Sequence, residues 1–194
     1  MSDPVNYSFY GTTVPVLRSI AATAIGVLTA AKDERSKATD GTLPSEQEIL
    51  DANFADMLPL RLQPILLAKF PLQALESLGL SGSATIPAFD PGFSSLDDVI
   101  EFFKQTMAVY DAIDETKYNE SAGKSVDVAI KPGTTLHMRG LADYFHGFII
   151  PNCYFHLSAM YMLLRSKGFA LGKGVYVGSF MSKQLQEDWA PLRK

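Results

Sequence analysis

Four long apolar segments with helical spacing constrain the fold of this chain more than any other feature. In the first, apolar residues recur every three or four positions, which is the repeat of an α-helix with one buried face. These residues are Val14, Leu17, Ala21, Ile25 and Leu28. The hydroxyl side chains at positions 12–13, followed by Pro15, predict that this helix begins there. We expect it to end between residues 32 and 37.

The second apolar segment, residues 60–78, contains Pro64 and Pro71. Each proline removes a backbone hydrogen bond, so we expect this helix to be kinked or to start late. A third helix should open at Ser95 and run to Tyr110.

The fourth helix should begin near Gly140 and end at residues 167–168, where a glycine follows the last apolar positions. Just before it, apolar and polar residues alternate on both sides of Pro132-Gly133, which predicts a two-stranded hairpin over residues 126–139. Four long helices joined in this way predict a mainly α chain, a four-helix bundle with a small β-hairpin before the last long helix.

Composition narrows the class of protein. The chain has 194 residues and a net charge of −4, so we expect a single domain over residues 1–194 and no binding to nucleic acid. The lone Cys153 indicates a reducing compartment, and residues 1–4 lack the pattern of a signal peptide. The most apolar stretches, residues 14–31 and 149–164, are interrupted by polar side chains and do not indicate membrane spans. A cytoplasmic protein without membrane contact is the expectation.

Several short motifs then carry a resemblance. They are Asp143-Tyr144-Phe145-His146, Ile150-Pro151-Asn152-Cys153-Tyr154-Phe155-His156, Leu163–Gly168, Leu171-Gly172-Lys173, Gly178, and the segments 10–16 and 56–60. Together they resemble a domain-of-unknown-function branch of the DinB-like (DinB/YfiT) superfamily of helical bundles. The resemblance implies an up-down-down-up bundle that is often dimeric. Superfamily members with known activity include thiol S-transferases and a maleylpyruvate isomerase.

The resemblance also implies a test for metal binding. In the wider superfamily, three histidines on two helices hold a divalent metal, and two of them lie four residues apart on the last helix. His156 matches the second of these positions, but Asn152 stands at the first. No third histidine occurs near residues 56–66, although Asp56 lies there. We therefore predict no metal ligand and no cofactor, with a divalent cation on Asn152, His156 and Asp56 as the alternative.

The strongest functional candidates remain Asn152 and His156, which are four residues apart and so share one face of a helix. Two polar side chains on an apolar helix are costly to bury without partners, which indicates either a pocket between helices or a satisfied buried pair. His156, His146 and Tyr154 are the catalytic candidates, with His156 as acid, base or ligand. The substrate-binding candidates are Asn152, Asp56, Arg61 and Tyr10.

Two functional hypotheses follow. The first is an enzyme of isomerase, cyclase or transferase type that acts on a small molecule in a pocket formed with His156 and Asn152. The alternative is a non-catalytic ligand carrier, or a dimerising scaffold with a vestigial metal site. A homodimer is expected in both.

Overall fold

The computed structural model describes residues 6–38 and 41–192. The prediction that residues 1–4 contain no signal peptide therefore lies outside the described part of the chain.

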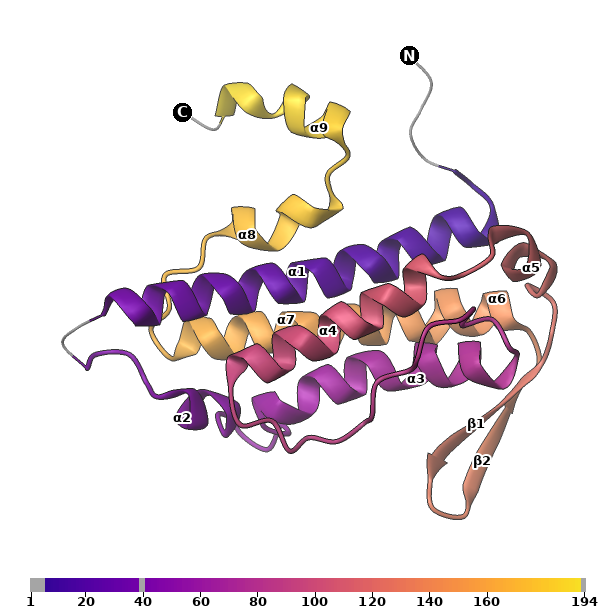
Figure 1. The fold of residues 1–194 in the computed structure, drawn as a ribbon, viewed down its shortest axis with the longest axis horizontal. Coiled ribbons are helices and arrows are strands. Elements are labelled where there is room, and N and C mark those ends of the chain that lie inside the picture. Colours follow the sequence, from indigo (N-terminus) through magenta and orange to yellow (C-terminus); the bar gives the residue numbers. More distant parts are fainter. Residues whose placement is uncertain (1–5, 39–40, 193–194) are drawn as a thin grey trace.

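Four long helices form the body of the molecule: α1 (Phe9–Lys37), α3 (Gln63–Ser77), α4 (Leu96–Asp111) and α7 (Ile150–Ser166). Each packs against two others, so that α1 lies between α4 and α7, and α3 completes the bundle on the other side (Figure 1). Helices α1 and α7 run in one direction and α3 and α4 in the other, and the long crossover before Ser95 joins the two parallel neighbours. The up-down-down-up bundle predicted from the sequence is confirmed.

Short elements connect and extend these helices. They are α2 (Glu46–Leu50), η1 (Leu60–Leu62), α5 (Glu115–Glu120), β1 (Val126–Lys131), β2 (Thr134–Met138), α6 (Leu141–Tyr144), η2 (Phe145–Ile149), α8 (Lys173–Val177), η3 (Gly178–Phe180), α9 (Lys183–Asp188) and η4 (Ala190–Leu192). Strands β1 and β2 pair antiparallel, and Gly133 takes a φ of 75° in the turn, which confirms the hairpin.

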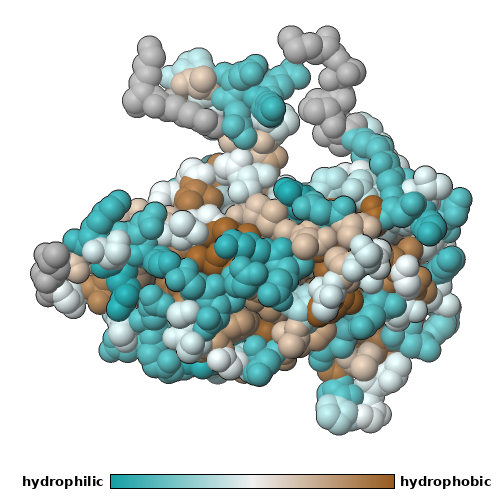
Figure 2. All heavy atoms as spheres, viewed as in Figure 1, coloured by the Kyte–Doolittle hydropathy of each residue, from teal (hydrophilic) through white to brown (hydrophobic). Residues whose placement is uncertain are grey.

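The C-terminal segment, residues 173–192, is built from short helices and contains no strand among its described residues. Its first part lies on the bundle, whereas α9 stands out from the body and contacts η4 more than any bundle helix (Figures 1 and 2). Figure 2 also shows polar and apolar side chains interspersed over the face formed by α1 and α4.

The first helix begins earlier than predicted. Its N-cap is Ser8, whose hydroxyl oxygen accepts a hydrogen bond from the Gly11 backbone N–H at 3.0 Å. The hydroxyl of Thr13, predicted to lie at the start, instead donates to the Phe9 carbonyl at 2.6 Å inside the helix. The helix extends this far because Phe9 stacks on Tyr118, with ring centroids 4.5 Å apart, so the additional turn gains an aromatic contact.

Helix α7 is entered through a π-helical turn, η2. Here the Ile150 N–H donates to the Phe145 carbonyl, five residues back. Pro151 follows directly after this turn; because the preceding residues are already helical, its missing N–H falls where the wide turn interrupts the regular α-helical bonding. One wide turn thus joins α6 to α7 at Pro151.

A second proline shapes the contact between α3 and α7. Pro71 lies inside α3 and has no N–H for the carbonyl of Leu67, four residues earlier. The Cys153 thiol of α7 donates to that carbonyl at 3.1 Å. Burial raises the pKa of this thiol, so it keeps its proton and serves as the missing donor.

Two stretches of the described chain, Phe9–Lys37 and Leu141–Ser166, are long and apolar enough to span a membrane by length and composition alone. The most apolar window of each is 50% and 44% buried inside the bundle, respectively. Both fit core helices of a bundle.

The pairing of Cys153 with the carbonyl freed by Pro71 can be tested by a double-mutant cycle. Cys153→Ala should lower the free energy of unfolding by about 1–3 kcal/mol, because a buried carbonyl loses its donor. In a Pro71→Ala background the alanine supplies the missing N–H, so the same change should cost about 1 kcal/mol less. The measurement is urea unfolding of the four proteins.

Pro64→Ala provides the matched control background. Pro64 is also buried but lies in the first turn of α3, where its missing N–H leaves no carbonyl unpaired. Cys153→Ala should cost the same with Pro64→Ala as in the natural protein. An equal cost in all three backgrounds would refute the pairing.

Candidate functional site

Three polar side chains meet between α3 and α7, and we call them the α3–α7 polar cluster: Gln63, Asn152 and His156. Gln63 and His156 are both buried, and the His156 Nδ1 lies 2.8 Å from the Gln63 Oε1. Asn152 donates from Nδ2 to the Leu66 carbonyl of α3 at 3.1 Å. Both polar residues that the sequence singled out on α7 are thus bonded to α3.

The hydrogen bonds fix the tautomer of His156. The Gln63 amide nitrogen donates to the Leu58 carbonyl at 2.7 Å, which leaves its Oε1 to accept from His156. His156 therefore carries its proton on Nδ1, and its Nε2 holds a free lone pair. Among the described residues no side chain or backbone group bonds to this Nε2.

Burial lowers the pKa of His156 to about 4, so the ring is neutral near pH 7. A neutral imidazole oriented by an amide resembles a base held by a second residue. The low pKa makes it a weak base, however, and Nε2 is better suited to accept a hydrogen bond from a hydroxyl or N–H group.

Two other candidates, His146 and Tyr10, lie at a different place on the bundle. His146 is exposed and bonds to α1, with its Nε2 3.0 Å from the Thr12 hydroxyl and its Nδ1 donating to the Ala142 carbonyl at 2.8 Å. Tyr10 packs edge-on against Tyr118, with ring centroids 6.0 Å apart. Tyr10 lies in the first turn of α1 and His146 packs beside that turn, whereas His156 contacts α3.

The third catalytic candidate, Tyr154, points toward the C-terminal segment. Its ring lies 5.6 Å from that of Phe180, and burial raises the pKa of its hydroxyl. Tyr154 and His156 therefore face opposite neighbours of α7.

The predicted anion-binding and carboxylate candidates also lie apart. Arg61 Nη2 is 2.7 Å from Asp51 Oδ1, so its guanidinium is engaged within the protein. Asp56 is exposed in a turn and forms no hydrogen bond or ion pair with another described residue.

The α3–α7 polar cluster does not fit the metal site that the superfamily resemblance implies. No three His, Cys, Asp or Glu side chains gather at one place in the described parts of the chain. Around His156 the neighbours are two amides, and the Asn152 nitrogen and the Gln63 oxygen are already used in hydrogen bonds. One imidazole with two amides is a poor donor set for zinc.

Gln63 is the member of the cluster that was not predicted from the sequence. It precedes Pro64 at the start of α3 and is a buried polar residue in an otherwise apolar segment. That contrast is the signal that could have indicated it, since buried amides need partners.

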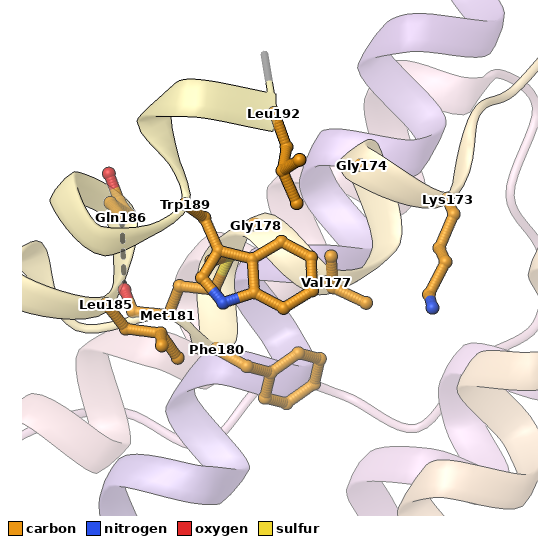
Figure 3. Close-up of a pocket in the computed structure, with 10 residues that line it drawn as sticks. All are labelled: Lys173, Gly174, Val177, Gly178, Phe180, Met181, Leu185, Gln186, Trp189 and Leu192. Atoms are coloured by element: carbon orange, nitrogen blue, oxygen red, sulfur yellow. Dashed lines mark hydrogen bonds between the residues drawn. The ribbon is translucent and has the colours of Figure 1, made fainter.

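A cavity of about 870 Å³ lies in the C-terminal segment, and none of the predicted site residues lines it. Its lining comprises Lys173, Gly174, Val177, Gly178, Phe180, Met181, Leu185, Gln186, Trp189 and Leu192. Figure 3 shows the Trp189 indole above Phe180, with Val177 and Leu192 beside it and Lys173 at the edge. Gln186 closes one side by donating to the Met181 carbonyl at 3.0 Å.

Helix α8, which contributes Lys173, Gly174 and Val177 to the lining, is fixed to the bundle through Tyr176. The Tyr176 hydroxyl lies 2.9 Å from the Ser158 hydroxyl of α7, and the Tyr176 carbonyl accepts from Thr23 of α1 at 3.2 Å. The sequence signal for the opposite wall is the spacing of Leu185 and Trp189, four residues apart as on one face of a helix.

These features define a DinB-like helical bundle. A crystal structure of a DinB family member protein from Shewanella denitrificans, at 1.83 Å resolution, is similar to this chain with a TM-score of 0.67 and 20% sequence identity, over 87% of this chain and 91% of that one. Residues 9–177 match the model of a domain of unknown function, DUF1993, and the chain belongs to that family. No curated protein matches the sequence.

The buried neutral state of His156 predicts a pH dependence of stability. The pKa of His156 is about 4 in the folded protein, against an ordinary value of 6.5 that applies to the unfolded chain. Between these two pH values the unfolded chain binds a proton that the folded chain does not. The free energy of unfolding should therefore fall by about 3 kcal/mol as the pH drops from about 6.5 to 4. Urea unfolding across this range measures the loss.

His156→Gln should remove that part of the pH dependence. His146→Gln is the matched control, since it removes an exposed histidine on the same helical stretch and should leave the loss in place. The assignment fails if the His156 variant loses stability with falling pH as steeply as the natural protein.

Proposed function

We propose that this protein binds a small apolar molecule in the C-terminal cavity and does not transform it, acting as a cytoplasmic ligand carrier. The observation that supports this is the cavity itself, whose volume of about 870 Å³ lies within the range of about 300–1,000 Å³ usual for ligand pockets. Its wall is aromatic and aliphatic, with Trp189 and Phe180 as the largest surfaces.

The chemistry of the lining supports binding rather than catalysis. Lys173 is the one titratable side chain among the described lining residues, so these residues supply no acid–base pair. A lysine at the edge favours a ligand with an apolar body and a neutral or anionic end. The anchored α8 and the outlying α9 also suit a pocket that opens to admit its ligand.

An enzyme that uses His156 is the second candidate function. It is favoured by the free Nε2 of His156 and by the Gln63 bond that orients the ring. In that case a substrate hydroxyl or N–H would bond to Nε2, with no contribution from the C-terminal cavity.

Trp189 provides a direct test, because it is the single tryptophan of the chain and lines the cavity. With anilinonaphthalene sulfonate, an anionic apolar probe, we expect quenching of Trp189 emission and energy transfer to the bound probe. Leu185→Asn should weaken this binding about tenfold or more, because it places an amide on the apolar wall.

Two variants serve as controls. Leu136→Asn makes the same change at an exposed leucine of the hairpin and should leave probe affinity unchanged. His156→Gln should likewise bind normally, which separates the carrier from the second candidate. Absence of energy transfer, or equal affinity in the Leu185 variant, would rule out the cavity as the binding site.

A further inference from the structure

Two aromatic side chains line the C-terminal cavity, and they belong to different elements. Phe180 ends η3, which packs on α1, and Trp189 follows directly after α9. In Figure 3 the indole of Trp189 lies above the Phe180 ring, yet no ring contact joins the two within the described chain. Both rings therefore line the cavity without covering each other.

The Phe180 ring is held in place by rings that do not line the cavity. Its centroid lies 5.6 Å from that of Tyr154 of α7 and 6.2 Å from that of Tyr176 of α8. Tyr176 in turn packs edge-on against Tyr161 of α7, with centroids 5.5 Å apart. Because these neighbours already fix Phe180, it loses little conformational freedom when a ligand packs on it.

Trp189 supplies the second ring. Its side chain is 51% exposed and makes no ring contact with a described residue, so its aromatic surface is available to a ligand. Aromatic rings prefer offset-stacked or edge-to-face contacts with centroids about 4.5–7 Å apart. A planar ring between Trp189 and Phe180 would make such contacts with both, whereas a saturated ligand would make only the contacts of any apolar surface.

The unpaired polar side chains of the lining are hydrogen-bond donors. Lys173 Nζ and Trp189 Nε1 carry only N–H groups, and neither side chain forms a hydrogen bond or ion pair with a described residue. Lys173 is also the one charged side chain of the described lining. A ligand with a single carboxylate matches that charge, whereas a phosphate dianion would leave one charge unpaired.

We propose that the ligand of the C-terminal cavity is an aromatic carboxylate, with its ring between Trp189 and Phe180 and its carboxylate at Lys173. This inference rests on the ligand binding proposed above for the same cavity, and it adds the chemical class of the ligand. An aliphatic acid would satisfy Lys173 equally well, so the two aromatic side chains are what separate the two classes.

Two acids with the same carbon skeleton test the proposal: 2-naphthoate and its saturated counterpart, decahydro-2-naphthoate. Isothermal titration calorimetry should show that 2-naphthoate binds about fivefold or more tightly, because only its ring makes aromatic contacts. Hydrophobic burial alone does not predict this order, since saturation adds apolar surface. The uncharged 2-naphthamide should bind about fivefold or more weakly than 2-naphthoate, because it cannot pair with Lys173.

Two variants assign these preferences to residues. Trp189→Leu should bring the affinities of the two acids to within about twofold of each other, and Lys173→Gln should do the same for 2-naphthoate and 2-naphthamide. Both residues are exposed and lie outside the core, so these changes test binding rather than folding. The matched controls, Phe148→Leu and Lys183→Gln, alter an exposed aromatic residue and an exposed lysine outside the lining, and should retain both preferences.

The outcomes separate this inference from the proposed function. If the two acids bind the natural protein equally, and Leu185→Asn still weakens both, the aromatic class is overturned while the carrier stands. A preference for 2-naphthoate that persists in Trp189→Leu, or 2-naphthamide binding as tightly as the acid, would overturn the assigned contacts. If neither the acids nor anilinonaphthalene sulfonate bind, the proposed function fails and this inference fails with it.

Discussion

The packing of α7 against α3 depends on a hydrogen bond that one proline makes necessary. Pro71 leaves the Leu67 carbonyl without its helical donor, deep in the bundle, and Cys153 supplies a replacement from the facing helix. A buried carbonyl tolerates few alternatives, so this bond sets which residues of α7 can face α3. Asn152, one position before the cysteine, then meets the adjacent Leu66 carbonyl, and His156, one turn further on, meets Gln63.

That arrangement explains why the polar residues of α7 need not imply a metal. The Asn152 amide nitrogen and the His156 Nδ1 each bond to α3. These hydrogen bonds offset the free-energy cost of burying the two side chains. In this chain α3 and α7 are joined by neutral hydrogen bonds. The His156 Nε2 is the one ring nitrogen of the cluster left free, and it is the atom of this cluster that can still accept a hydrogen bond from a ligand.

The sequence predicted the bundle well because helical periodicity is a local property. The apolar repeats, the start of the third helix at Ser95 and the hairpin around Gly133 were all visible without tertiary information. The start of α1 was misplaced because the packing of Phe9 on Tyr118 joins residues over a hundred positions apart. Gln63 was missed for the same reason, since its role exists only where α3 meets α7. The spacing of Asn152 and His156 identified a shared face but not what lies opposite it.

The division of the chain at α8 has a consequence for how this protein can vary. No described residue from Lys173 onward is buried in the core, whereas the four long helices provide nearly all of it. Substitutions in α9 and η4 should therefore have little effect on the free energy of unfolding, yet they would reshape one side of the cavity wall, formed by Leu185, Gln186 and Leu192. The match to the family also ends at residue 177, before most of that wall. The four long helices provide the stability, and the cavity wall contributes little to it. New binding preferences can therefore arise one substitution at a time without unfolding the protein.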